Sequence, residues 1–401
     1  MIDICNDVEK ALADILSYWT NKMPDQVNGG FIGKIDVFEQ LDLEAPKGAV
    51  LNARILWAFS AAFIHTHNPV YKEMADRAYR YIINHFIDGK FGGVYWTVTS
   101  EGKPLETKKQ IYALSFTIYG LAEYYKITQD EDVLEAGVKL FNAIETHSFD
   151  KDRGGYFEAF NRDWSPMEDL RLSRKDVNEK KTMNTHLHIL EAYTNLYKVN
   201  KDEQVHVKIK GLLDSFYKHI INPETMHLNL FMNEEWQVSG SGISYGHDIE
   251  ASWLLLEAAQ LLGEQPLINQ FKELAIRLTE AAVQGLEKDG SLIYEYFPES
   301  GKFNKERHWW VQAEALVGFL NAWELTGKQE YFNYFSSCWR FINQYIIDKE
   351  EGEWFWGVDE DLLIMKGEDK AGLWKCPYHN ARACIEILNR LLNKRIPSQP
   401  H

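Results

Sequence analysis

Three histidines and a glutamate stand at spacings that suit proton transfer. His247 and Glu250 are three residues apart, so on a helix they share a face, where the carboxylate would bond one ring nitrogen, fix the tautomer and raise the basicity of the imidazole. His188 follows Asn184 by four residues, one helical turn, whereas His186 must face elsewhere. The spacing predicts a general base paired with an orienting carboxylate.

Other polar and aromatic side chains recur near the starts of apolar helical segments. Tryptophans among them offer flat faces suited to sugar rings, although core packing is an equally good explanation of them. The histidines and glutamates lack the H-E-x-x-H pattern of a metal site, and no glycine-rich phosphate loop is present, so we expect neither a metal nor a cofactor. These further candidates are Arg54, Tyr112, Trp310, Glu314, Trp374, His379 and Arg382.

The composition excludes several classes of protein. The 401 residues are 45% hydrophobic and 25% charged, as in ordinary globular proteins. A net charge of −16 without a basic run argues against nucleic acid or an anionic membrane as a partner. Four cysteines without a C-x-x-C pair, an acidic N-terminus and a longest apolar stretch of only residues 55–64 predict a cytoplasmic protein. We expect a monomer that acts on a small molecule.

Short glycine- and aromatic-rich segments repeat along the chain. The glycines at positions 30, 93, 155, 290 and 352 are separated by 63, 62, 135 and 62 residues. The long interval is about two periods, and residues 227–231 form a similar segment that lacks the glycines. The chain therefore contains six units of about 65 residues, which predicts a closed repeat.

Helical periodicity places two helices in each unit. We predict an all-α, single-domain (α/α)6 barrel over residues 1–401, with six helical hairpins and short β segments in the connections. The more apolar second helix of each hairpin should lie inside, so that the candidate residues meet at one mouth, where helix N-termini favour a developing anion. The outer helices are expected at 4–20, 70–87, 131–147, 203–220, 267–286 and 330–346, and the inner ones at 48–66, 109–126, 181–199, 246–262, 306–326 and 377–392.

Five segments resemble the cellobiose 2-epimerases of the N-acylglucosamine 2-epimerase superfamily. They are NARILW at 52–57, KTMNTHLH at 181–188, SYGHDIEASW at 244–253, WWVQAE at 309–314 and WKCPYHN at 374–380. The resemblance implies cofactor-independent conversion of cellobiose and lactose into epimers with mannose at the reducing end. The sequence departs from the family's motifs at two positions, where Ala53 replaces the usual Ser and Ala381 replaces the usual Gly. Each change exchanges one small residue for another, so it bears on fine specificity and not on the chemistry.

The resemblance also assigns roles to residues. It makes His247 and His379 the acid/base pair, with His188 assisting at the sugar oxygens. Inversion at C2 needs ring opening, removal of the proton next to the aldehyde, and its return on the other face, so the enediolate must be stabilised strongly. The positions implied to line the site are Arg54, Tyr112, Asp176, Asn184, Glu250, Trp310 and Trp374.

Other functions remain open at this stage. The same chemistry could serve a mannose or N-acylglucosamine 2-epimerase, or an aldose–ketose isomerase, although residues 353–374 are long enough to cover a second sugar ring. An inverting glycoside hydrolase would need two carboxylates about 6.5–9.5 Å apart. Glu250 and Glu314 could be offered for that, but the histidines would go unexplained. A lyase on the same barrel and a non-catalytic sugar-binding protein are further alternatives.

Overall fold

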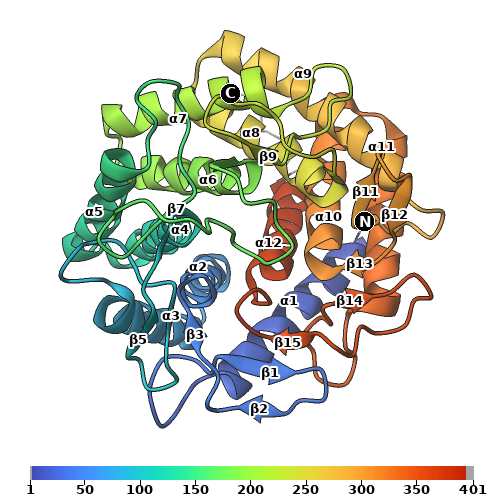
Figure 1. The fold of residues 1–401 in the computed structure, drawn as a ribbon. Coiled ribbons are helices and arrows are strands. Elements are labelled where there is room, and N and C mark those ends of the chain that lie inside the picture. Colours follow the sequence, from blue (N-terminus) through green and yellow to red (C-terminus); the bar gives the residue numbers. More distant parts are fainter. Residues whose placement is uncertain (1, 394–401) are drawn as a thin grey trace, which may run out of the picture.

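The computed structural model describes residues 2–393 and shows two concentric rings of helices (Figure 1). The outer ring consists of α1 (Ile2–Lys22), α3 (Pro69–Tyr81), α5 (Glu131–His147), α7 (Glu203–Ser215), α9 (Gln265–Ala282) and α11 (Gln329–Phe341). The inner ring consists of α2 (Ala49–Thr66), α4 (Ile111–Thr128), α6 (Met183–Val199), α8 (Tyr245–Leu262), α10 (Trp309–Thr326) and α12 (Tyr378–Asn393). The predicted (α/α)6 barrel is confirmed.

The inner helices are buried on all sides, as their apolar sequences predict. Every residue of α2 from Ala49 to Ala62 is buried, whereas outer helix α3 buries only three of its residues, Ala75, Ala78 and Tyr81. α2 is also long and apolar enough to cross a membrane, but 78% of that stretch is buried inside the protein. Its hydrophobicity is therefore that of a core helix.

Three outer helices end in a wider π-helical turn. These turns are η1 (Ile82–Phe86), η2 (Phe216–Ile220) and η4 (Ile342–Ile346), and α9 ends instead in a 3-10 turn, η3 (Val283–Gly285). Each turn runs into an isolated antiparallel bridge that begins the connection to the inner helix. One of these bridges, Ile221 to Leu228, lies in the unit without glycines, so the sixth repeat is present where the spacing placed it.

Short antiparallel strands join successive units around one mouth of the barrel. In five of the pairs the strand just before an inner helix bonds to the connection of the following unit: β3 (Lys47–Gly48) with β4 (Thr97–Val98), β6 (Lys109–Gln110) with β7 (Ala159–Phe160), β8 (Lys181–Thr182) with β9 (Phe231–Met232), β10 (Ile243–Ser244) with β11 (Glu295–Phe297), and β13 (Arg307–His308) with β14 (Gly357–Val358).

The ring closes where the first connection meets the last. β1 (Lys34–Asp36) pairs with β15 (Asp369–Ala371), while β2 (Leu41–Asp42), β5 (Pro104–Glu106) and β12 (Lys302–Asn304) complete local hairpins. Helix α1 packs against α12 at the same seam. Because β3, β6, β8, β10 and β13 each lead directly into an inner helix, their pairing fixes the height of those helix N-termini around the mouth.

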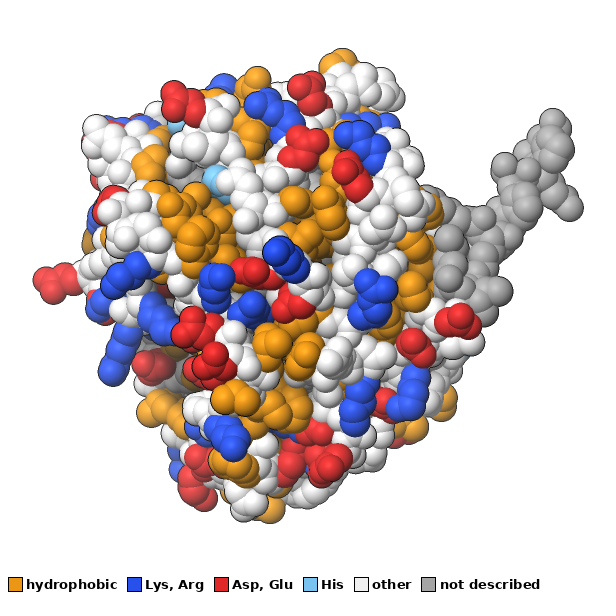
Figure 2. All heavy atoms as spheres, turned by 90° about the vertical axis from the view of Figure 1, so that its right-hand side faces the viewer, with side chains coloured by type: hydrophobic (Ala, Val, Ile, Leu, Met, Phe, Trp, Pro, Cys, Tyr) orange, Lys and Arg blue, Asp and Glu red, His pale blue; other side chains and the backbone are white. Residues whose placement is uncertain are grey.

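The outer surface mixes charges of both signs. On the face formed by the right-hand side of Figure 1, acidic, basic and apolar side chains alternate without a continuous basic area (Figure 2). This face therefore offers no electrostatic track for a nucleic acid.

Candidate active site

The predicted site residues lie mainly on the first two turns of the inner helices. Trp310 and Glu314 on α10, and Asn184 and His188 on α6, occupy the second and sixth positions of their helices. Residues four apart lie on one helix face, so each pair points along the same side of its helix. Six helices arranged in this way bring their polar side chains together at one mouth.

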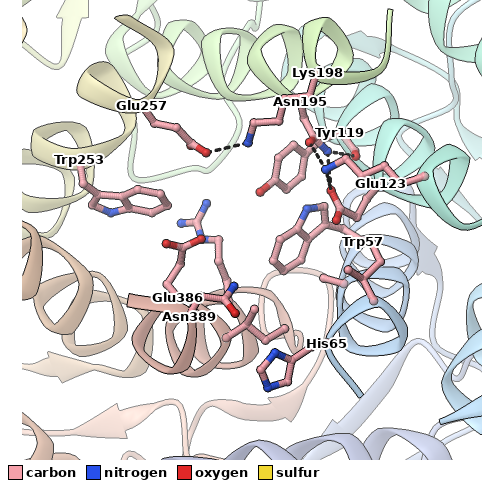
Figure 3. A pocket seen from close by; sticks show the side chains of 15 residues that line it. Trp57, His65, Tyr119, Glu123, Asn195, Lys198, Trp253, Glu257, Glu386 and Asn389 are labelled. Atoms are coloured by element: carbon pink, nitrogen blue, oxygen red, sulfur yellow. Dashed lines mark hydrogen bonds and ion pairs between the residues drawn. The ribbon is translucent and has the colours of Figure 1, made fainter. Parts of the chain in front are cut away.

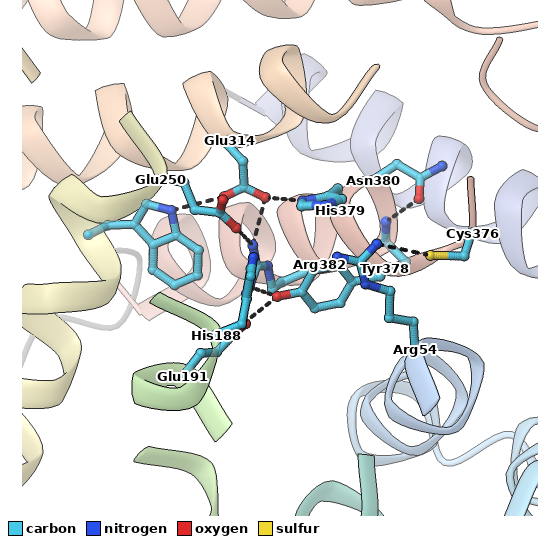
Figure 4. A network of polar contacts seen from close by, with 12 residues as sticks. Arg54, His188, Glu191, Glu250, Glu314, Cys376, Tyr378, His379, Asn380 and Arg382 are labelled. Atoms are coloured by element: carbon cyan, nitrogen blue, oxygen red, sulfur yellow. Dashed lines mark hydrogen bonds and ion pairs between the residues drawn. The ribbon is translucent and has the colours of Figure 1, made fainter. Parts of the chain in front are cut away.

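Arg382 lies at the centre of a buried ionic cluster (Figure 4). Its guanidinium Nη2 donates to Glu250 Oε1 at 2.9 Å and to Glu314 Oε1 at 2.7 Å, and Nη1 bonds Glu191. These carboxylates come from α8, α10 and α6, whereas the arginine comes from α12. One buried cation therefore ties four inner helices together, and removing it would leave uncompensated carboxylates.

Two histidines are oriented by carboxylates of this cluster. His379 Nδ1 lies 2.6 Å from Glu314 Oε1, and His188 Nδ1 lies 2.9 Å from Glu191 Oε2. Burial lowers the pKa of both imidazoles, for His379 together with the charges of Arg54 and Arg382. Both rings are therefore neutral at neutral pH, with Nδ1–H donated to the carboxylate and Nε2 left as a base.

The predicted pair of His247 and Glu250 is wrong. His247 Nδ1 lies 2.7 Å from Ser244 Oγ, and Glu250 bonds Arg382 instead. The two residues share a helix face as expected, but the guanidinium offers Glu250 a charged partner deeper in the barrel. Burial, with a contribution from His188, lowers the pKa of His247 to about 3, so this imidazole is neutral without a carboxylate.

Arg54 lies beside the aromatic wall of the site. Its Nη2 donates to the Tyr112 hydroxyl at 2.8 Å, and its guanidinium lies over the Phe116 ring, 4.1 Å from the centroid. The Nε atom is buried and has no hydrogen-bond partner. Tyr112 also meets the His188 ring edge-on at 5.0 Å. The arginine charge is thus held next to His188.

The two predicted tryptophans stand on opposite flanks of this group. The ring centroid of Trp310 lies 4.8 Å from that of His247 and 5.7 Å from that of His379, so Trp310 borders both imidazoles. The ring centroid of Trp374 lies 6.0 Å from that of Tyr112 and 5.7 Å from that of Trp96. Both indoles are only partly buried against the core. Their placement favours ring stacking with a ligand over core packing.

Asn184 and Asp176 belong to the same mouth but are less tightly held. Asn184 Oδ1 is buried without a partner. Asp176 lies on the connection before α6, which crosses the mouth in front of the inner helices (Figure 1). Burial raises the pKa of Asp176, and its charge in turn contributes to the raised pKa of Tyr294, a neighbour of Trp310. Asp176 therefore lies on the Trp310 side.

Two site residues escaped the sequence reasoning. Glu191 orients His188 and binds Arg382, and the Tyr378 hydroxyl donates to Glu191. Glu191 follows His188 by three residues, the same spacing that suggested a pair at His247, so the signal was present. Nothing in the spacing marks Tyr378, which reaches Glu191 only across the closed barrel.

Glu250, Glu314 and His379 together could be mistaken for a metal site. One ligand atom from each lies within 4.8 Å of the others. However, the Glu250 and Glu314 oxygens already bond the Arg382 guanidinium, and His379 turns Nδ1 toward Glu314. The positive charge that a metal would bring is supplied by the arginine, so the donor set does not fit a metal ion.

The fold and the site define a class: an (α/α)6 barrel whose mouth brings together neutral histidines, a buried arginine and partly buried tryptophans. The sequence matches the N-acylglucosamine 2-epimerase (GlcNAc 2-epimerase) family over residues 30–383. The chain belongs to this family and is a carbohydrate epimerase.

Similarity to individual proteins extends over nearly the whole chain. It is 50% identical over 374 residues to the cellobiose 2-epimerase of Bacteroides fragilis, covering 93% of this chain and 95% of that protein. The cellobiose 2-epimerase of Ruminococcus albus is 38% identical over 96% of this chain and 98% of its own length. The solved cellobiose 2-epimerase of Bacillus thermoamylovorans B4167 superposes with a TM-score of 0.93 at 39% identity, covering 97% of this chain and all of that one.

Proposed function

We propose that this protein inverts C2 of the reducing-end sugar of β-1,4-linked disaccharides, converting cellobiose to glucosyl-mannose and lactose to epilactose. The observation that carries the proposal is the pair of neutral imidazoles, His247 and His379, that border one tryptophan, Trp310. Relatives named cellobiose 2-epimerase, similar over almost the entire chain, support the disaccharide.

The reaction is a balanced proton exchange. After ring opening, Nε2 of one imidazole takes the C2 proton, the electron pair moves into the C1–C2 bond, and negative charge develops on O1. Arg54 stabilises this oxygen, because a preorganised cation acts strongly in a buried site. His188, whose Nε2 carries no proton, accepts a hydrogen bond from a neighbouring sugar hydroxyl. The second imidazole takes up a proton from solvent at Nε2 and delivers it to the opposite face of C2, which restores the aldehyde with inverted configuration. The first imidazole then releases the abstracted proton to solvent, so both rings return to the neutral state.

The remaining predicted residues hold the substrate in this proposal. Trp310 and Trp374 stack against sugar rings, and the unpartnered Asn184 Oδ1 accepts from a sugar hydroxyl. Asp176, on the connection across the mouth, binds the second sugar ring. Tyr112 fixes Arg54, and Glu250 fixes Arg382.

Two features argue against hydrolysis. Glu250 and Glu314 meet on one guanidinium nitrogen, and their oxygens lie within 4.8 Å of each other, less than the about 6.5–9.5 Å of an inverting pair. Both carboxylates are also buried, and Glu314 lies on the Nδ1 side of His379. They orient other groups and do not flank a glycosidic bond.

Turnover in D2O tests the proposal. Cellobiose, lactose and mannose are incubated separately, and the products are resolved by NMR. We expect glucosyl-mannose and epilactose with deuterium at C2, because an imidazole proton exchanges with solvent. Label at C1 would accompany any ketose. An epimer that keeps its protium at C2 contradicts the mechanism, and turnover of mannose alone contradicts the disaccharide preference.

The proposal includes no metal or cofactor, and the protein should act as a cytoplasmic monomer. Four buried free thiols, Cys5, Cys338, Cys376 and Cys384, suit a reducing compartment. We expect EDTA to leave turnover unchanged. Activity lost to EDTA and restored by a divalent ion would replace the arginine-based account with a metal-based one.

A further inference from the structure

A second cavity of 420 Å³ opens at the opposite end of the barrel, where the inner helices end (Figure 3). Its wall is built by residues of α2, α4, α6, α8 and α12. Its size falls within the range of about 300–1,000 Å³ found for small-molecule sites. The reaction proposed above uses no part of this end of the barrel.

The charged groups of the cavity wall are already paired. The carboxylates bond cations of the protein: Glu123 with Lys126 at 2.5 Å, Glu257 with Lys198 at 2.7 Å, and Glu386 with Arg390 at 3.1 Å. A charged ligand would have to separate one of these pairs at a cost. A neutral ligand with many hydroxyls could instead bond the pairs without breaking them.

One tyrosine hydroxyl of the cavity wall is open to the cavity. Tyr119 is 8% exposed, and its hydroxyl has no hydrogen bond among the described residues. In Figure 3 this hydroxyl points into the space between Trp253 and Trp57. A ligand hydroxyl that bonded it would add a hydrogen bond worth about 0.5–1.5 kcal/mol.

Flat aromatic surfaces accompany this hydroxyl. The Trp57 ring stacks on Tyr119, with centroids 5.3 Å apart and an interplanar angle of 8°, and Trp253 faces them across the cavity (Figure 3). Aromatic faces next to polar groups suit a ring that has both C–H and hydroxyl surfaces. Asn389, an exposed residue at the rim, offers an amide that makes no hydrogen bond within the described part of the chain.

We propose that this cavity is a second, non-catalytic binding site for a neutral polyhydroxylated ring, of the monosaccharide class. Tyr119 supplies the anchoring hydrogen bond. Trp57, which stacks on Tyr119, and Trp253, which lies under the Arg382 guanidinium, supply the apolar surface that borders the cavity. The inference goes beyond the proposed function, because it concerns the far end of the barrel and does not depend on which sugar is epimerised.

The site is coupled to the catalytic cluster through two shared residues. Arg382 and Trp253 line the cavity, while Arg382 bonds Glu250 and Glu314, and Trp253 Nε1 donates to Glu314 Oε2 at 3.1 Å. Glu314 in turn orients His379. A ligand against Arg382 and Trp253 therefore changes the setting of His379, and with it the turnover number.

Calorimetric titration with D-glucose tests the site, using Tyr119→Phe and a matched control, Tyr125→Phe. Tyr125 lies on the same helix, but its hydroxyl bonds Glu131 outside the cavity. We expect Tyr119→Phe to weaken binding by about three- to tenfold, as for one lost hydrogen bond, and Tyr125→Phe to bind like the wild type. Asn389→Trp, which blocks the rim, should abolish this binding, whereas Gln260→Trp on the surface of α8 should not.

Three results would decide against the inference. Equal affinity in the wild type, Tyr119→Phe and Asn389→Trp proteins would place all glucose binding at the catalytic mouth. A glucose-soaked crystal with only water in the cavity would overturn the site directly. Binding that depends on Tyr119 but leaves the turnover number unchanged would overturn the coupling. The binding result stands even if the epimerase proposal fails, because it needs no turnover.

Discussion

At the scale of single residues, burial sets the protonation of the two imidazoles that we propose as bases. It lowers the pKa of both His247 and His379, and the charges of Arg54 and Arg382 lower that of His379 further. A neutral imidazole at neutral pH can take up a proton, and a carboxylate partner is not required to make it neutral. The base therefore depends on its position in the barrel more than on its neighbour in the sequence.

Replacing either base should nearly abolish the reaction. We expect His247→Ala and His379→Ala each to lower the turnover number at least ~100-fold, the usual scale of acid–base catalysis, with an unchanged helical circular dichroism spectrum. His206→Ala on outer helix α7 is the matched control and should keep full activity. Near-normal turnover in either site variant would show that the proton takes another route.

Glu314→Gln and Glu250→Gln should change the pH dependence of the reaction differently. Glu314 accepts from His379 Nδ1, so Glu314→Gln lowers the basicity of that ring and moves the acid limb of the kcat/KM profile to lower pH, with at least about a tenfold loss of turnover. Burial and the neighbouring Glu314 raise the pKa of Glu250 well above its ordinary value. Glu250 bonds Arg382 and contacts neither proposed base through a hydrogen bond among the described residues, so Glu250→Gln should leave the limb in place.

The comparison is made on pH–rate profiles of both variants and the wild type. An acid limb that moves only in Glu250→Gln would restore the pairing of Glu250 with His247 that the sequence suggested. Equal shifts in both variants would mean that the cluster titrates as one unit.

At the scale of the elements, a repeated turn joins each outer helix to the connection that follows. In five of the six units an Asp or Asn accepts the backbone N–H groups two and three residues on, as Asp88 does from Lys90 and Phe91. In three units a buried lysine before the inner helix binds this aspartate, for example Lys109 to Asp88 at 2.9 Å. The repeat thus includes the aspartate as well as the glycines.

Alanine substitutions at two adjacent glycines of one such turn should distinguish the cost of backbone strain from the cost of side-chain crowding. Gly154 and Gly155 have φ angles of +72° and +76°, so alanine at either should cost roughly 1–2 kcal/mol of unfolding free energy. A Cβ at Gly154 meets nothing within 4 Å, whereas one at Gly155 would lie 2.4 Å from Trp236 and 2.8 Å from His186. In urea titrations Gly155→Ala should be less stable than Gly154→Ala by about 1–3 kcal/mol; equal losses would mean that Trp236 moves freely.

A buried histidine of the scaffold should make stability depend on pH. His186 accepts from Tyr156 N–H, and burial lowers its pKa to about 4. Below pH 6.5 the unfolded chain takes up a proton that the folded site refuses, so unfolding free energy falls by about 1.4 kcal/mol per pH unit until pH 4. His186→Gln should lose this part of the slope, because Gln312 fills the equivalent place in α10 with a side chain that does not titrate.

Urea titrations between pH 7 and pH 5 measure this slope. His206→Gln, on an outer helix, should unfold with the slope of the wild type. If His186→Gln also kept that slope, the acid loss of stability would have to come from other groups.

At the scale of the whole molecule, the barrel is closed by one buried carboxylate. Glu353 accepts from Lys375 Nζ at 3.0 Å and from Asn380 Nδ2 at 2.6 Å, and it also bonds Trp19 of α1. It therefore joins the first helix, the last connection and the last inner helix. Asn380 adjoins His379 in sequence, so closure of the ring also sets the height of this proposed base.

Neutralising this carboxylate should weaken the entire barrel at once. Glu353→Gln leaves Lys375 buried without a counter-charge, and we expect a loss of about 3–5 kcal/mol of unfolding free energy. The exposed Glu351→Gln, which removes only a surface pair with Lys22, should cost no more than about 1 kcal/mol. If residues 1–401 form one domain, tryptophan fluorescence and circular dichroism should shift together; two separate transitions would contradict the single-domain prediction.

The sequence by itself determined the architecture. Local periodicity predicts the six repeats and their twelve helices. The inner helices can be recognised because a helix that is buried on all sides has a largely apolar sequence. The helix boundaries agree to within a few residues because glycine turns and strand-like segments punctuate the chain. The mouth at the helix N-termini followed from the same repeat, since equivalent positions of a closed ring must face the same end.

Only the tertiary structure decided how the polar residues pair. Sequence spacing brought His247 and Glu250 to one helix face, but Arg382, more than 130 residues later, offers that carboxylate a stronger partner. The Glu314–His379 and Tyr378–Glu191 contacts likewise join different inner helices. Hydrogen bonds inside a barrel run between helices, and their geometry depends on ring closure, which no local pattern records. The far cavity, bounded by five helices, exists for the same reason.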